Sequence, residues 1–226
     1  MKRWGLVVTL LYAVVVLALL APATLVLAMS SKPAFSDFME FYQEFGLWIV
    51  AGFFILCQFA LLTLSVDTTQ KRMRSRTPII VSTVATAILL AVITAVVLLS
   101  STVVVSGEKN FPKVGLFSLP AILGVSWVVW AALFYLLYRN SDDPVTNALA
   151  WLFRGSVLEL LVAVPSHVIV RRRHDCCAPA VTGFGITSGI AIMLISFGPS
   201  VMLLFKKRME KYQQWGSAAG GQGSEL

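Results

Sequence analysis

Long apolar stretches alternate with short polar segments along the whole chain. Five stretches contain no charged residue at all: 4–28, 46–66, 78–105, 116–138 and 180–205. A sixth stretch, 148–170, is also mainly apolar but contains Arg154, Glu159 and His167. About 20 helical residues cross the hydrocarbon core of a bilayer, so each stretch is long enough to span a membrane. The pattern therefore predicts six transmembrane spans.

A spanning segment must satisfy its backbone hydrogen bonds internally, which only helices and closed barrels achieve. Barrel strands alternate apolar and polar residues, whereas these stretches are continuously apolar. We therefore expect an all-α bundle of about six transmembrane helices, forming one polytopic membrane domain over residues 1–215. The segment 216–226 is rich in glycine and serine and is expected to be a disordered tail.

The composition supports a membrane protein, since 58% of the residues are hydrophobic and 13% are charged, with a mean hydropathy of +0.82. A soluble domain is about a quarter charged, and a chain of this size cannot bury so much apolar surface in one core. The net charge of +7 comes largely from basic residues at the ends of apolar stretches, as in 71–76 and 206–208. That placement is typical of contact with lipid headgroups. We expect the lipid bilayer as a partner, and no nucleic acid.

Basic residues near the span ends predict the orientation of the bundle, because they concentrate on the cytoplasmic side. One side of the first four spans carries Lys2, Arg3, four basic residues between 71 and 76, and Arg139. The other side carries Lys32, Lys109 and Lys113. We therefore expect a cytoplasmic N-terminus in a multi-pass protein of a plasma membrane, and the short loops favour a bacterial inner membrane.

The same rule does not decide how the last third of the chain crosses the membrane. If 148–170 spans, the arginines at 171–173 lie outside; if it re-enters, the basic residues of 206–211 lie outside instead. We expect six crossings with both termini inside, because the 23 residues of 148–170 are enough to span and re-entrant loops are rarer.

The first span and the loop after it carry two further signals. Residues 4–28 follow two basic residues as a signal peptide does, but 25 apolar residues exceed the usual apolar region of a signal, so we expect a retained anchor. Aromatic residues recur at helical spacing between Phe35 and Phe45, with acidic residues between them. This predicts a short interfacial helix in the first outer loop, with Ser36 as its N-cap. Its aromatic side chains are expected to anchor the fold at the membrane surface rather than to dock a partner.

Small residues on two spans predict close packing between helices. The third span has a stripe of small residues four apart, formed by Thr83, Ala87, Ala91 and Ala95. The last span has Gly185 and Gly189 at the same spacing. Pro199 removes a backbone hydrogen bond and is expected to kink the last span.

Glu159 lies near the centre of its span, where an unpaired charge costs at least about 2 kcal/mol. On a helix it shares a face with small or polar residues, namely Gly155, Ser156, Ala163 and Ser166. Such a face belongs inside the bundle. Together with Arg154 and His167, it forms the candidate intramembrane polar site. Arg154 lies about 140° around the helix from Glu159, which disfavours a pair within the helix.

Two interpretations of Glu159 stay open at this point. The carboxyl either handles a proton or a cation in a polar cavity, or it is a structural acid that is protonated or paired across helices. The other spans contain no second acid or base, which weakens a relay of protons, because a relay needs several stations.

The densest polar cluster, at 171–177, contains His174, Asp175, Cys176 and Cys177 after three arginines. These side chains are ligand types for zinc or copper, and neighbouring positive charges favour a reactive thiolate. However, adjacent cysteines fit tetrahedral coordination poorly, and the chain has no Cys-x-x-Cys pair. We therefore favour a juxtamembrane loop with its arginines at headgroup level, and we expect no bound metal or cofactor.

Sequence motifs of common enzymes do not occur in the chain, which has no phosphate-binding loop, serine hydrolase elbow or paired carboxylates. We therefore expect a non-enzymatic binding, assembly or small-transport component, with other membrane subunits or a second copy of the chain as partners. The alternative is a thiol- or metal-dependent membrane enzyme centred on Cys176 and Cys177. Cys57 lies in an apolar stretch and is expected to be a buried structural residue.

Overall fold

The computed structural model describes residues 2–29, 33–67, 76–106, 111–138, 144–175 and 178–198. Within these ranges the regular structure is helical and contains no strand, which confirms the predicted all-α fold. Six helices in these ranges are long and apolar enough to cross a membrane, as predicted: Leu6–Ala28, Phe45–Leu62, Ile80–Val105, Pro120–Leu137, Thr146–Arg172 and Ala178–Gly198. The protein is therefore a helical bundle compatible with a multi-pass membrane protein.

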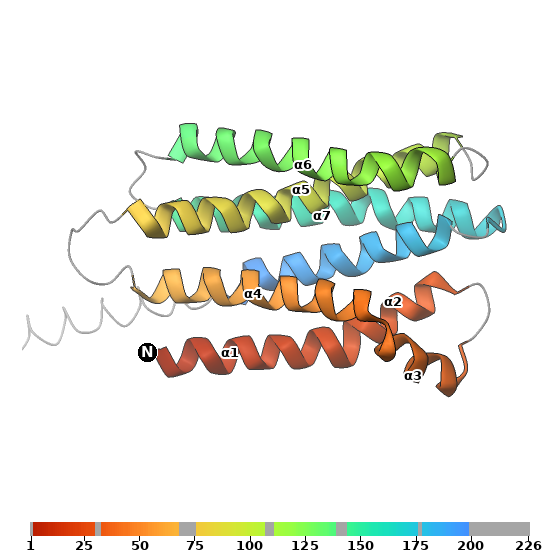
Figure 1. Ribbon diagram of the computed structural model, residues 1–226, viewed down its shortest axis with the longest axis horizontal. Helices are drawn as coiled ribbons and strands as arrows, with labels where there is room; N and C mark the ends of the chain where they lie inside the picture. Colours follow the sequence, from red (N-terminus) through yellow and green to blue (C-terminus); the bar gives the residue numbers. More distant parts are fainter. Residues whose placement is uncertain are drawn as a thin grey trace, which may run out of the picture.

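The labelled helices follow one another in the order α1 (Lys2–Val15), η1 (Val16–Leu20), α2 (Ala21–Ala28), α3 (Phe35–Gln43), α4 (Phe45–Asp67), α5 (Arg76–Ser106), α6 (Phe111–Tyr138) and α7 (Pro144–Arg172). The helix α1, the π-helical turn η1 and the helix α2 together form the first span. The short helix α3 occupies the loop before the second span, α4. The sixth span, Ala178–Gly198, follows α7 and is drawn in blue in Figure 1. It is called the last span below.

Consecutive spans run antiparallel along the bundle (Figure 1). The helix α1 packs against α4, and α5 packs against both α6 and α7. The helix α7 is continuous from Pro144 to Arg172, although Pro165 lies inside it, and it extends along the bundle beside α5. The predicted span 148–170 is therefore one continuous helix that is long enough to cross a membrane, and it contains no re-entrant turn.

Two arginines hold the end of α7 against its neighbours. The guanidinium of Arg171 donates a hydrogen bond to the carbonyl of Met29, directly after α2, and Arg173 donates to the carbonyl of Val104, near the end of α5, at 2.8 Å. The three helix ends thus meet at the end of the bundle opposite the N-terminus (Figure 1). Carbonyls at helix C-termini carry partial negative charge, which explains why arginines gather at this end of the bundle.

The last span lies inside the bundle, with α7 on one side and α4 on the other (Figure 1). Three of its glycines touch three different helices, because an added Cβ would lie 2.9 Å from Leu27 at Gly183, 2.6 Å from Val96 at Gly185 and 3.1 Å from Leu160 at Gly189. A side chain does not fit at such distances without a shift of its neighbours. The predicted packing role of the glycine pair on this span is therefore confirmed.

The small-residue stripe of the third span also lies inside the bundle. The helix α5 packs mainly against α6 and α7. The three alanines of the stripe, Ala87, Ala91 and Ala95, are buried, as predicted for packing, whereas Thr83 at the start of the stripe is half-buried.

Apolar side chains cover much of the outside of the bundle, while polar groups lie within it. On α6, Val125, Val128 and Leu136 are 65%, 61% and 67% exposed, whereas Ser156 and Glu159 on α7 are 0% exposed. This distribution is the reverse of that in a water-soluble protein, and it fits a hydrocarbon surrounding.

The first span contains a π-helical turn at Val16–Leu20, just before Pro22. In this turn Ala21 donates its backbone N–H to the carbonyl of Val16, five residues back. The next bond of the same kind would run from Pro22 to Leu17, but proline has no N–H to donate. The hydroxyl of Tyr42 on α3 donates to the carbonyl of Leu17 instead. The helix α3 is thereby attached to the first span where that span departs from regular α-helix.

The predicted short helix in the first loop is present as α3, but its N-cap was assigned to the wrong residue. The helix begins at Phe35 with Ala34 as N-cap, so Ser36 lies inside the first turn. The carboxylate of Asp37 accepts the backbone N–H of Ala34 at 2.8 Å, and this bond fixes the start of the helix two residues before the predicted one. The position of α3 in the membrane interface stays a prediction.

Several sequence predictions fall on parts of the chain outside the described residues. These are the kink at Pro199, the tail 216–226, the cysteines at 176 and 177, and the basic segments 71–75 and 206–208.

Candidate functional site

Glu159 on α7 is fully buried at the interface with the last span. The hydroxyl of Ser188 donates a hydrogen bond of 2.7 Å to Oε1 of Glu159. The other carboxyl oxygen, Oε2, is buried and has no hydrogen-bond partner within the described part of the chain. It lies 3.3 Å from the position that a Cβ at Gly189 would occupy, so the absence of a side chain there leaves room beside it.

The small and polar face predicted around Glu159 does face the interior. Ser156, Ala163 and Ser166 are all buried. The hydroxyl of Ser156 donates to the carbonyl of Phe153 at 2.9 Å, and that of Ser166 donates to the carbonyl of Val162 at 2.7 Å. These two serines are thus satisfied by their own helix, and the partner of Glu159 comes from the last span.

Arg154 is exposed on α7, whereas Glu159 on the same helix is fully buried. This agrees with the expectation that the two residues do not stack within the helix. The structure therefore separates Arg154 from the rest of the candidate site.

His167 makes a second polar contact between α7 and the last span. It is 7% exposed, and its Nδ1 lies 2.9 Å from Oγ1 of Thr182. The hydroxyl of Thr182 also lies 3.2 Å from the carbonyl of Ala178, to which it donates. When the hydroxyl donates to this carbonyl, its oxygen accepts a hydrogen bond from Nδ1–H of His167.

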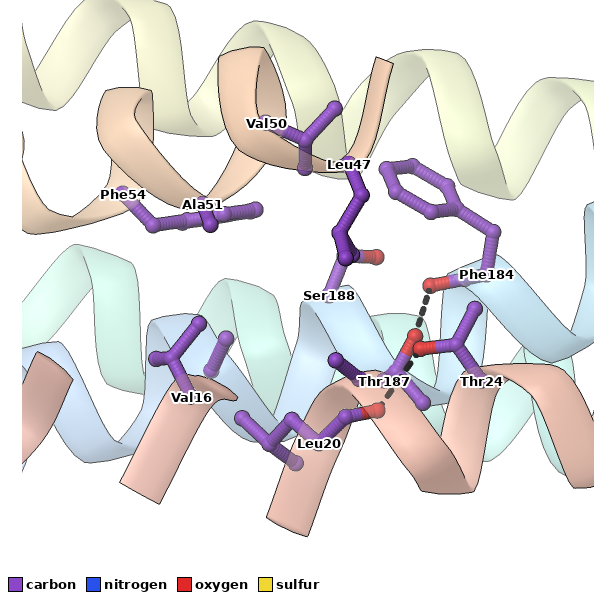
Figure 2. A pocket seen from close by; sticks show the side chains of 12 residues that line it. Val16, Leu20, Thr24, Leu47, Val50, Ala51, Phe54, Phe184, Thr187 and Ser188 are labelled. Carbon is purple, nitrogen blue, oxygen red and sulfur yellow. Dashed lines mark hydrogen bonds between the residues drawn. The ribbon is translucent and has the colours of Figure 1, made fainter. Parts of the chain in front are cut away.

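A pocket of about 50 Å³ lies between the first span, α4 and the last span. Its lining is mainly apolar and includes Val16 and Leu20 of the π-helical turn, with Phe54 of α4 (Figure 2). Three hydroxyl residues also line it: Thr24, Thr187 and Ser188. Thr24 and Thr187 bond to carbonyls of their own helices, as the dashed lines in Figure 2 show. A volume of this size holds a few water molecules.

Ser188 connects this pocket to the buried carboxyl, because it lines the pocket and donates to Glu159. The π-helical turn forms another part of the same wall. Such turns occur frequently at functional sites. The pocket and Glu159 together therefore form the candidate site.

Two residues of the polar segment 171–177 have a structural role, since Arg171 and Arg173 bind carbonyls at helix ends. Arg172 and His174 are exposed, and His174 adopts a positive φ of 57° at the turn that ends the helix. Among the described residues, no group of three or more His, Cys, Asp or Glu side chains is placed to hold a metal ion. Cys176 and Cys177 lie outside those residues, so the thiol and metal hypotheses remain untested. Cys57 is buried in the hydrophobic core, as expected.

Three hydroxyl residues of the interior were not found from the sequence, namely Ser100, Thr182 and Ser188. Serine and threonine are common in transmembrane helices, so their presence alone distinguishes none of them. Their importance depends on which residue of another span lies opposite, and that register is visible only in the structure.

No family model, curated protein sequence or solved structure matches this chain. The geometry around Glu159 is therefore the basis on which a function is assigned.

Proposed function

We propose that the protein is a non-enzymatic small-transport component of a membrane, in which Glu159 takes up and releases a proton. The observation that supports this proposal is the state of the carboxyl: it is fully buried, Ser188 satisfies one oxygen, and the other oxygen has no protein partner within the described residues. A group that served only to join two helices would have both oxygens engaged.

The cost of burying charge explains why a proton is the favoured ligand. An ionised carboxylate in hydrocarbon is expensive unless it is paired or hydrated, and the one hydrogen bond from Ser188 does not neutralise it. Uptake of a proton removes the charge and turns Oε2 into a donor. A site of this kind changes its charge with little change in volume, as a coupled transport step requires.

The surroundings of Glu159 support exchange with a bound solute or with water. Ser188 lies between the carboxyl and the pocket beside the π-helical turn. A hydroxyl donates one hydrogen bond and accepts others at the same time. A change in the protonation of Glu159 is therefore able to alter the hydrogen bond that Ser188 makes with an occupant of the pocket. We further propose a plasma membrane of a bacterium as the location, with the N-terminus in the cytoplasm, on the distribution of basic residues along the chain.

Proton flux in lipid vesicles tests this proposal. The purified chain is reconstituted with a pH-sensitive dye inside, and a pH gradient and a potassium diffusion potential are imposed. We expect the wild-type chain to dissipate the gradient about tenfold faster than Glu159→Gln, which keeps the shape of the side chain and removes its acid. Glu44→Gln is the matched control, because Glu44 is exposed before α4.

Two results decide the outcome. Equal flux in the wild-type chain and in Glu159→Gln, at equal amounts of folded protein, contradicts the proposal. If Glu159→Leu also raises the stability of the bundle without any effect on flux, the carboxyl is only a structural acid.

A further inference from the structure

The contact between α7 and the last span forms a continuous row of residues from Glu159 to the end of the bundle. On α7, Glu159, Ala163, His167 and Arg171 are four residues apart and therefore share one face. On the last span the opposing positions are three apart, at Ser188, Gly185 and Thr182. We call this row the α7 seam.

Each position on the α7 seam makes a defined contact. Ser188 bonds to Glu159 at 2.7 Å, and Thr182 bonds to His167 at 2.9 Å. Between them, a Cβ at Gly185 would lie 3.2 Å from the Cβ of Ala163. The seam is thus polar at both ends and narrow in the middle, where only small residues meet.

A buried hydroxyl lies beside the narrow part of the α7 seam. Ser100 on α5 is 0% exposed, and its Oγ has no hydrogen-bond partner among the described residues. It lies 3.8 Å from the position that a Cβ at Gly185 would occupy. Glu159 Oε2, which also has no hydrogen-bond partner among the described residues, lies next to Gly189, one helical turn from Gly185. Two oxygens that the described part of the chain leaves without a partner therefore lie at the two glycines of the same helix face.

Buried polar atoms that lack a protein partner are usually bonded to ordered water. We propose that water enters the α7 seam from the end of the bundle that carries Arg171 and Arg173, and that this route delivers protons to Glu159. Water binds to Ser100 Oγ and to Glu159 Oε2, and His167 lies on the same face nearer the entrance. The proposal rests on the proposed function of Glu159 and adds the route and the side of access.

The positive charges at the entrance are offset in part by helix ends. The guanidinium groups of Arg171 and Arg173 bind the carbonyls of Met29 and Val104, which carry partial negative charge. His167 lies about one turn inside Arg171 and about 12 Å along the helix from Glu159. Water molecules and the hydroxyls of the seam must therefore cover the distance between the two titratable groups.

Other titratable groups near the seam are few among the described residues. On α5 there is none between Ile80 and Val105, and on α4 there is Cys57. On α1 there is Tyr12, whose hydroxyl donates to the carbonyl of Ala191 at 3.3 Å. On α7 itself, His167 and Arg171 share the face of Glu159, while Arg154 is exposed. Beyond the end of α7 there is Asp175, whose Oδ2 is buried and has no hydrogen-bond partner among the described residues. His167 is the imidazole on the face of Glu159, with one ring nitrogen bonded to Thr182.

Chemical labelling of Glu159 with independent pH on the two sides of a membrane tests the route. Dicyclohexylcarbodiimide enters lipid and reacts with protonated carboxyl groups, so the labelled fraction of Glu159, measured by mass spectrometry, reports its protonation. Vesicles are prepared with buffers of different pH inside and outside, and a protease site at the N-terminus reports the orientation of the chain. We expect labelling to follow the pH of the compartment that faces Arg171–Arg173.

Proton flux in two variants provides the second readout. Ser100→Ala and His167→Gln are expected to slow flux by about tenfold, the rate equivalent of one lost hydrogen bond. Ser101→Ala is the control for the first, because Ser101 is exposed on the same helix and bonds to the carbonyl of Val97. His174→Gln is the control for the second, because His174 is exposed beyond the end of α7.

The failure of the route is distinguishable from the failure of the proposed function. The route through the α7 seam is wrong if labelling follows the pH of the compartment at the N-terminal end instead, or if flux is unchanged in both variants. Proton uptake by Glu159 stands in either case. If labelling depends on neither pH, Glu159 exchanges no proton, and both proposals are overturned.

Discussion

Ser188 donates a hydrogen bond of 2.7 Å to Glu159 across the interface between α7 and the last span, 29 residues apart in the sequence. Within the described part of the chain, this is the one hydrogen bond that the carboxyl accepts, because Oε2 has no hydrogen-bond partner. The pair joins the last span to α7 near the level of the pocket. The strength of this hydrogen bond therefore affects both the stability of the bundle and the protonation of Glu159.

Substitution of Ser188 by alanine is expected to lower the free energy of unfolding by about 1–3 kcal/mol, since it leaves a buried carboxyl without a protein partner. The measurement is unfolding of the chain in mixed micelles. Ser166→Ala is the control, because Ser166 on α7 is also buried but bonds to the carbonyl of Val162 in its own helix. We expect a smaller loss there. Equal losses would show that Ser188 contributes no more than a hydroxyl within its own helix.

Substitution of Gly185 by alanine tests the packing at the narrow part of the α7 seam. The added methyl would lie 2.6 Å from Val96 and 3.2 Å from Ala163, so a loss of about 1–3 kcal/mol is expected from overpacking. Gly124→Ala on α6 is the control, because nothing lies within 4 Å of its added Cβ. It should leave stability unchanged or raise it by up to about 1 kcal/mol through helix propensity. A tolerant Gly185→Ala would refute close packing at this position.

Replacement of Arg171 by glutamine tests whether arginines at the end of α7 cap helix ends. The guanidinium of Arg171 binds the carbonyl of Met29, so its loss is expected to cost about 1 kcal/mol and to lower the temperature of unfolding. Arg172→Gln removes the same charge from the next position, where the side chain is exposed. If both variants lose the same stability, net charge rather than the contact with Met29 is responsible.

The sequence was sufficient for the number of spans and for the position of Glu159 inside the bundle. Both follow from local patterns, since the length of an apolar stretch predicts a span and the small residues around Glu159 predict a buried face. The partners of Glu159 and His167 were not predictable. Ser188 and Thr182 lie on another helix, and their position opposite α7 depends on how the two helices are shifted along each other.

Two local features of the first loop and first span show a similar limit. The start of α3 was predicted at Ser36, but the reciprocal bond between Asp37 and Ala34 places it earlier. The π-helical turn before Pro22 was not predicted, because the carbonyl of Leu17 obtains its donor from Tyr42, 25 residues further along the chain. The first feature depends on a local bond from the side chain at N3, and the second depends on a contact that the local sequence does not specify.

Infrared difference spectroscopy of the reconstituted protein between low and high pH tests the protonation of Glu159 most directly. A protonated carboxyl has a carbonyl stretching band that is lost on ionisation. The other carboxyl groups of the chain also titrate, but a carboxyl buried in an apolar environment absorbs at a higher frequency than one in water. We predict a band at this higher frequency in the wild-type difference spectrum, its absence in Glu159→Gln, and its presence in Glu44→Gln. Identical difference spectra for the wild-type chain and Glu159→Gln would show that Glu159 neither gains nor loses a proton, which contradicts the account.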